Sequence, residues 1–384
     1  MTVPDGVAEG LTAAPAAAHR FTALDSLRGI AALGVLLHHL PATNGLAVLP
    51  LAGAGSLFVD LFFVLSGFVI AASYGERLAD GFSVRRFALL RLGRVVPLHL
   101  FMVAAYLALE LAAWMFGSGG LNLSAPFSGV HSPGHLLRAI FLLDGYFPIK
   151  HNFYNGVSWS ISIELLLYGL AVLAFRARRA GLAAFYALGL AALALQLAGV
   201  NLPVLTNALE RGLAGFAGGL ACWQLYQLRP QPLPFVALFE VLALGALFGF
   251  VWFVPLFGPP ALILVPAMAV VFVFAQQAGP LSGFLMQRGW VWLGAISYSL
   301  YMVHVMVLAR IADLFLLASR YTAQPLARYT WQDGIPIKAI DLPLLPALLV
   351  QGAMIGACLL AAHWTYRLIE EPARQWSRRR AEQL

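Results

Sequence analysis

Long apolar runs are the feature that most restricts how this chain can fold. About ten of them approach or reach membrane-spanning length, near residues 24–41, 56–75, 95–116, 158–175, 182–200, 209–227, 235–256, 260–279, 291–317 and 344–366. Only 11% of the residues are charged and the mean hydropathy is +0.81, whereas soluble domains carry about a quarter charged residues. We therefore predict an all-α membrane protein, a polytopic bundle of about ten transmembrane helices.

The distribution of basic residues predicts how this bundle is oriented. Most of the 24 Lys and Arg residues fall in alternate connecting segments, including 77–94 and 367–380. Because basic residues are retained on the cytoplasmic side, both termini are expected in the cytoplasm and the protein in the cytoplasmic (inner) membrane. The same arginines, next to membrane lipids, account for the net charge of +7, so no nucleic-acid partner is expected.

The chain divides into three parts. Residues 1–20 lack the basic start and apolar core of a signal peptide, and we expect a disordered cytoplasmic lead there. Residues 21–375 make one membrane domain, followed by a basic cytoplasmic tail at 376–384. The sequence has no CxxC pair and no HExxH motif, so no metal site is expected.

The first apolar run carries two ionisable groups on one helical face. It reads LDSLRGIAALGVLLHHL, with Arg28 near its start and His39 eleven residues further on. Eleven residues make about three helical turns and rise roughly 16 Å, about half the hydrocarbon thickness. Snorkelling to lipid headgroups explains Arg28 alone, and an interfacial position explains His39. Ionisable groups in line within a membrane also mark reaction or transport paths, so both interpretations stay open.

The segment SVRRFALLRLGRVVP gathers arginines at the predicted cytoplasmic surface. Arg91 and Arg94 lie three residues apart on one helical face, and Arg86 lies about a turn and a half earlier. Such clusters commonly bind lipid headgroups. Paired guanidinium groups also fork onto phosphate oxygens, and an acyl-coenzyme A (acyl-CoA) carries several phosphates. The pattern is consistent with either a lipid contact or a phosphate site.

Two carboxylates fall inside apolar runs. Glu164 lies in SWSISIELLLYG, with Ser160 one turn before it and Tyr168 one turn after it. A glutamate in lipid must be paired or protonated, so Glu164 either pairs with an arginine or belongs to a functional site. Asp60, near the outer end of FVDLFFVLSGF, either orients a histidine or contacts outer water.

Other polar residues have simpler explanations. The ninth run carries Tyr298, Tyr301 and His304 at helical spacing, a pattern that usually serves packing. Glu210 precedes Arg211 and is expected to pair with it. The charged stretch YRLIEEPARQW near the end of the chain is explained by anchoring at the membrane interface.

Together these stretches resemble the acyltransferase-3 family of integral-membrane acyltransferases, which O-acylate extracytoplasmic sugars and some antibiotics. The matching pieces occur in family order between about residues 20 and 375: LDSLRGIAALGVLLHH, FVDLFFVLSGF, RRFALLRLGRVVP, SWSISIELLLYG, RGLAGFAGGL, LGAISYSLYMVH and YRLIEEPARQW. An arginine followed after ten residues by a histidine, combined with the later RxxR, is the specific part of the match. The resemblance implies that residues 21–375 are a membrane acyltransferase domain.

The resemblance also implies roles for residues at matching positions. His39 corresponds to the family's essential histidine, Arg28 to its paired arginine, and the pair Arg91 and Arg94 to the RxxR motif on the acyl-CoA side. Glu164 matches the glutamate of the SWS-x-x-x-E segment, although ELLLYG replaces the more usual EEQFY. Some members fuse a C-terminal hydrolase-like domain. Because this chain stops soon after its last apolar run, we expect any such acceptor-side transferase to be absent or a separate partner.

The predicted function is O-acylation, with acetyl-CoA or another acyl-CoA as donor and a sugar or glycan hydroxyl as acceptor. A histidine acts as general base or transient acyl carrier, and a carboxylate orients it. The alternative is a proton-coupled transporter or lipid-linked sugar flippase, although the inverted repeats of many carriers are not found. The predicted site residues are the catalytic His39, Glu164 and Asp60, the donor-binding Arg28, Arg86, Arg91 and Arg94, and the substrate-binding Trp159, Ser160 and Tyr298.

Overall fold

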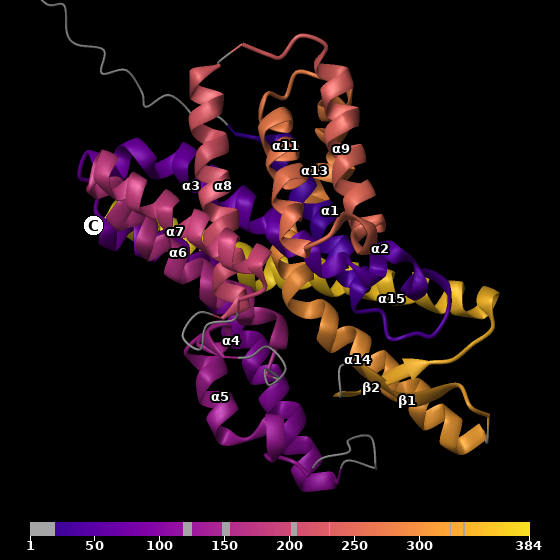
Figure 1. Ribbon diagram of the computed structural model, residues 1–384. Helices are drawn as coiled ribbons and strands as arrows, with labels where there is room; N and C mark the ends of the chain where they lie inside the picture. The colour runs from indigo at the N-terminus through magenta and orange to yellow at the C-terminus, as the bar shows by residue number, and fades with distance from the viewer. Residues whose placement is uncertain are drawn as a thin grey trace, which may run out of the picture.

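The chain folds into a bundle of helices (Figure 1), and the computed structural model describes residues 20–117, 125–147, 154–200, 206–229, 231–322, 324–332 and 335–384. The longer helices are α1 (Thr22–His38), α3 (Phe58–Ala79), α4 (Val84–Phe116), α6 (Trp159–Arg176), α7 (Arg178–Ala198), α8 (Asn207–Leu228), α9 (Val236–Trp252), α11 (Leu264–Ala275), α14 (Ser297–Thr322), α15 (Leu344–Thr365) and α16 (Glu371–Glu382). The shorter elements are α2 (Pro50–Gly53), α5 (Pro133–Ile140), α10 (Val254–Phe257), α12 (Pro280–Leu285), α13 (Arg288–Ala295), β1 (Ala327–Gln332) and β2 (Ile335–Ile340).

Apolar helices of spanning length confirm a multi-pass helical membrane protein. Among the described residues six stretches are long and apolar enough to cross a membrane: Gly55–Ala79, Val84–Phe116, Gly156–Arg176, Arg178–Ala198, Ser297–Thr322 and Leu344–Glu382. Each predicted apolar run carries a helix, but several are short, and α1 has only 17 residues. The number of ten spans and the cytoplasmic termini stay predictions. Nearly all of the predicted N-terminal lead lies outside the described residues.

Helices α3 and α8 cross with their backbones in close contact (Figure 1). A Cβ atom on Gly219 of α8 would meet the carbonyl oxygen of Val64, and one on Gly67 of α3 would meet that of Phe216. Small residues let membrane helices approach this closely, which favours dispersion contacts between them. The glycines of RGLAGFAGGL and LSGF therefore fix the centre of the bundle, on which α6 and α11 also pack.

Helix α4 is pinned on two sides near its arginines. Pro97 interrupts its hydrogen-bonding pattern, and the Tyr298 hydroxyl of α14 donates to the Val95 carbonyl oxygen (2.6 Å) in the same turn. On another side α16 packs so closely that a Cβ on Gly93 would meet Ser377. The segment predicted as a basic tail is thus helical as far as Glu382 and packs against α4.

The predicted outer loop 318–343 contains the antiparallel pair of strands β1 and β2, an addition to the expected all-helical fold. This hairpin is tied to the chain just after His39, because the Ile340 amide donates to Pro41 (2.7 Å) and the Thr43 amide donates to Ile340 (3.0 Å). An ion pair between Lys338 and Asp313 joins it to α14. The hairpin therefore covers the region where α1 ends.

Candidate active site

A cavity lies among α1, α3, α4, α6 and α14. Six of the predicted site residues line it: Arg28, Arg91, Arg94, Ser160, Glu164 and Tyr298. Four others lie outside its described lining: His39, Asp60, Arg86 and Trp159. The structure thus brings together three of the four predicted donor-binding residues, Arg28 from α1 and the pair Arg91 and Arg94 from α4.

Three guanidinium groups give this cavity an excess of positive charge. Arg91 stacks on Tyr74, with its guanidinium carbon 4.6 Å from the ring centroid, and its Nε is buried without a hydrogen-bond partner among the described residues. Arg28 lies 3.6 Å from the carboxylate of Asp25, at the start of α1. Arg94 follows Arg91 by one turn of α4, on the same face. Such a cavity attracts a ligand with several negative charges.

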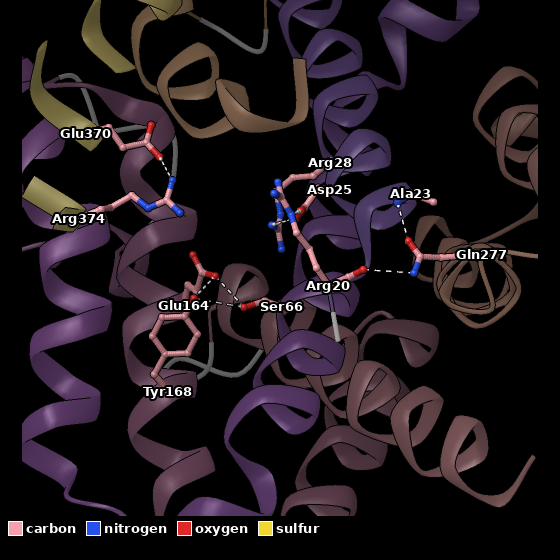
Figure 2. A network of polar contacts seen from close by, with 10 residues as sticks. All are labelled: Arg20, Ala23, Asp25, Arg28, Ser66, Glu164, Tyr168, Gln277, Glu370 and Arg374. Carbon is pink, nitrogen blue, oxygen red and sulfur yellow. Dashed lines mark hydrogen bonds and ion pairs between the residues drawn. The ribbon is translucent and has the colours of Figure 1, made fainter. Parts of the chain in front are cut away.

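Glu164 is the carboxylate in the cavity wall, and two hydroxyl groups hold it. Ser66 of α3 donates to its Oε1 at 2.7 Å, and Tyr168, one turn along α6, donates to the same oxygen at 2.5 Å. Figure 2 shows this carboxylate with Arg28 and Asp25 across from it. These contacts fix the orientation of Glu164 and hold it within the arginine cavity.

A buried carboxylate, Glu370, lies behind the arginine cavity. It is 2% exposed, accepts a hydrogen bond from Ser299 (2.7 Å) and lies 4.0 Å from Arg374 (Figure 2). It ends a π-helical turn, Tyr366–Glu370, and interacts electrostatically with Arg94. π-Helical turns are frequent at functional sites. The sequence interpretation placed this stretch at the membrane interface and missed its buried glutamate.

His39 lies immediately after α1 and contacts a second histidine. Its Nδ1 is 2.9 Å from the Val35 carbonyl oxygen and 3.2 Å from Nε2 of His304 on α14. The centroids of the two imidazole rings are 4.9 Å apart. His304 in turn packs against Tyr301, which lines the arginine cavity. The histidine pair is therefore one layer of side chains behind the cavity wall.

The structure corrects the expectation that Asp60 or Glu164 orients His39. Both oxygens of Asp60 accept hydrogen bonds from Arg211, at 3.0 and 2.8 Å. Glu164 is held by hydroxyl groups, as described above. The imidazole next to His39 is that of His304, which the sequence pattern had assigned to packing.

Arg211 also corrects one further expectation, because it pairs with Asp60 of α3 rather than with its neighbour Glu210. Its guanidinium carbon lies 5.2 Å from the Trp159 ring centroid, which places Trp159 beside this ion pair. The Arg86 guanidinium carbon lies 5.7 Å from the Phe82 ring centroid, and its buried Nε has no hydrogen-bond partner among the described residues. The substrate-binding role of Trp159 and the donor-binding role of Arg86 stay predictions.

A second, larger cavity lies at the N-terminal end of α3, where Asp60 and Arg211 contribute to its lining. Its other polar and aromatic lining residues are Ser56, Gln196, Asn207 and Trp252. On the predicted topology these positions belong to the outer ends of their helices. Within the described residues no group of three or more His, Cys, Asp or Glu side chains is placed to hold a metal ion.

Comparison with known proteins identifies the family. The sequence matches the profile of the acyltransferase domain of the acyltransferase-3 family over residues 21–363. It is 32% identical over 159 residues to "Protein 2 in picA locus" of Rhizobium radiobacter, which covers 38% of this chain and 78% of that protein. It is 31% identical over 160 residues to acyltransferase MdmB of Streptomyces mycarofaciens, 39% of this chain and 38% of that protein. No solved structure matches the chain. The chain belongs to the acyltransferase-3 family and is a membrane acyltransferase.

Proposed function

We propose that this acyltransferase moves an acyl group, most simply acetyl, from cytoplasmic acyl-CoA to a hydroxyl of an extracytoplasmic or lipid-linked sugar, such as an exopolysaccharide or O-antigen unit. The observation that carries the proposal is the cavity in which Arg28, Arg91 and Arg94 outnumber the one carboxylate, Glu164. Acyl transfer itself is supported by the family and by a relative named as an acyltransferase. The donor, the acceptor and the inner-membrane location are the proposed part.

The phosphates of the donor bind the arginine cavity. Arg91 and Arg94 face it from successive turns of α4, and the buried Nε of Arg91 is free to donate a hydrogen bond. A guanidinium group forms paired hydrogen bonds with phosphate oxygens, which a carboxylate-poor site leaves available. Glu164, held by Ser66 and Tyr168, borders the part of the cavity through which the pantetheine arm passes.

His39 acts on the acceptor hydroxyl. As a general base it removes the hydroxyl proton while the oxygen attacks the thioester carbonyl carbon, and the departing thiolate then takes that proton. The alternative is a two-step route: a His39 nitrogen attacks the thioester carbon and the thiolate leaves, then the acceptor hydroxyl displaces the imidazole from the acyl carbon and its proton passes to the thiolate. In either route Tyr301 turns aside, because this side chain lies between the cavity and the histidine pair.

The acceptor sugar enters the second cavity. Its amide and charged groups, Gln196, Asn207 and the Asp60–Arg211 pair, offer donors and acceptors for sugar hydroxyls, and Trp252 offers an aromatic face. Because α3 lines both cavities, one helix leads from the donor side to the acceptor side. A separate acceptor-side protein is compatible with this arrangement.

The test uses the purified full-length protein in lipid nanodiscs with radiolabelled acetyl-CoA and a panel of lipid-linked and free glycans. We expect release of free CoA together with label on the glycan. His39→Ala should abolish this turnover and leave binding of CoA intact, because the arginine cavity is separate. Turnover of His39→Ala at the wild-type rate would show that His39 is not the catalytic residue. Movement of an unmodified sugar across vesicles without CoA release would favour a flippase.

A further inference from the structure

The contact between His39 and His304 carries information about where the proton of each ring lies. The two side chains come from α1 and α14, 265 residues apart in the sequence, and meet at 3.2 Å between His39 Nδ1 and His304 Nε2. His304 is fully buried, and Tyr301 packs against its ring. Because two nitrogen atoms at this distance need one proton between them, one ring donates and the other accepts.

His304 is fixed as the acceptor by its other nitrogen. Its Nδ1 lies 3.1 Å from the Leu300 carbonyl oxygen, one turn earlier in α14. A carbonyl oxygen only accepts hydrogen bonds, so Nδ1 carries the proton. In the neutral ring Nε2 then presents a lone pair, and this lone pair faces His39.

His39 is correspondingly fixed as the donor. Its Nδ1 has two acceptors within reach, the Val35 carbonyl oxygen at 2.9 Å and His304 Nε2 at 3.2 Å. A proton on Nδ1 can be shared between both acceptors, whereas a bare Nδ1 would direct its single lone pair at atoms that also only accept. With its proton on Nδ1, neutral His39 has an unprotonated Nε2, which is the atom available to act as a base or nucleophile.

We propose that His304 is the positioning residue for His39: it accepts the Nδ1 proton, sets the ring orientation and leaves Nε2 of His39 as the reactive atom. The proposal rests on the proposed function of His39. When Nε2 takes the hydroxyl proton, the imidazolium that forms keeps its Nδ1 proton between two acceptors, which stabilises the positive charge next to a neutral ring. The role that a carboxylate has in many hydrolytic triads is here given to a neutral imidazole.

His38 provides a matched control. Its ring also contacts that of His39, with centroids 5.0 Å apart, but its Nδ1 lies 2.8 Å from the Ala52 carbonyl oxygen. A replacement of His38 therefore removes an adjacent imidazole without removing the acceptor for the Nδ1 proton of His39. If a neighbouring ring mattered only through packing, His38 and His304 would respond alike.

The first measurement is ¹⁵N NMR of the full-length protein in nanodiscs with ¹⁵N-labelled histidine, the His39 signals being identified by their loss in His39→Asn. We expect a protonated Nδ1 and a bare Nε2 for His39 in the wild type, in His38→Gln and in His304→Gln, whose amide oxygen replaces the acceptor. His304→Leu should give a mixture of the two tautomers. A wild-type His39 that carries its proton on Nε2 would overturn the proposal, and this result does not depend on either His304 variant folding.

The second measurement is kinetic. His304→Leu should lower kcat by about 100-fold, in the range of lost general-base assistance, and leave the KM for acetyl-CoA unchanged. His304→Gln should recover most of the lost kcat, and His38→Gln should keep the wild-type value. If His39→Ala is inactive and His304→Leu has the wild-type kcat, the role of His304 is wrong and that of His39 stands. If His39→Ala is fully active, the proposed function of His39 fails, while the NMR result still shows which nitrogen of His39 carries the proton.

Discussion

Two arginine regions of this protein differ in how their charge is balanced. Arg211 is bound by both oxygens of Asp60 and stacks near Trp159, so its charge is paired. In the donor cavity three arginines share the wall with one carboxylate, and that carboxylate already accepts two hydroxyl hydrogen bonds. Arg211 is therefore held in a close ion pair, whereas Arg91 and Arg94 face a cavity whose lining contains only one carboxylate, Glu164.

The difference has a physical cause. A buried ion pair is stable only when the attraction between partners offsets the loss of hydration, which two close hydrogen bonds achieve for Arg211. Unbalanced cations in a cavity raise the energy of the empty protein and lower it again when an anion binds. We therefore expect Asp60 and Arg211 to control stability, and Arg91 and Arg94 to control affinity for the donor.

The largest expected effect is the loss of stability when the Asp60–Arg211 ion pair is broken. Asp60→Leu should lower the free energy of unfolding by about 3–5 kcal/mol, because it leaves a buried guanidinium unpaired. The measurement is thermal unfolding in detergent, in which size-exclusion chromatography monitors the fraction of folded protein after heating. The double variant Asp60→Leu/Arg211→Met should regain most of the loss. A single variant as stable as the wild type would show that the pair is hydrated and not structural.

The next largest effect is on donor affinity and concerns the arginines of the cavity. Arg94→Gln and Arg91→Gln should each raise the KM for acetyl-CoA by about 10- to 100-fold, the value of one lost charge-assisted hydrogen bond, and leave the unfolding temperature unchanged or higher. Steady-state kinetics and calorimetric binding of CoA measure this. Arg85→Gln, on an exposed position of the same helix, is the matched control and should keep the wild-type KM. If all three variants raised the KM equally, the arginines would act through a general surface potential and not through a specific binding site.

A smaller effect concerns the carboxylate within the cavity. Tyr168→Phe removes one of the two hydroxyl donors to Glu164 and should cost about 1 kcal/mol of stability. Ser66→Ala should cost a similar amount, and the double variant should cost more than the sum, because Glu164 then has neither partner. Additive losses in thermal unfolding would mean that the two hydroxyls act independently on Glu164.

The last effect depends on pH and concerns a carboxyl outside the spanning helices. Burial raises the pKa of the Asp144 carboxyl to about 6, and the nearby Arg138 opposes this shift in part. Because the folded state holds the proton more tightly than the unfolded chain, the free energy of unfolding should fall by about 2 kcal/mol as pH rises from about 4 through 6. Unfolding temperatures of wild type and Asp144→Asn across this range measure it, and the difference should favour the variant increasingly as pH rises. A constant difference would contradict the assignment.

Much of the fold and part of the site could be predicted from local sequence. Apolar runs near spanning length predicted the helices, since a helix in lipid must satisfy its own backbone and present apolar side chains. Helical spacing also placed Arg91 with Arg94, and Glu164 with Tyr168, because residues three or four apart share a face. These contacts lie within one helix, whose geometry does not depend on its neighbours.

The sequence by itself therefore determined a helical membrane protein with Arg91 and Arg94 on one face of a helix. Only the tertiary structure decided that Asp60 pairs with Arg211, that Glu370 is buried behind the cavity and that His304 meets His39. The physical reason is that each of these contacts depends on which helices pack together and at what rotation. Residue spacing within one helix carries no information about the side chains that another helix brings to it.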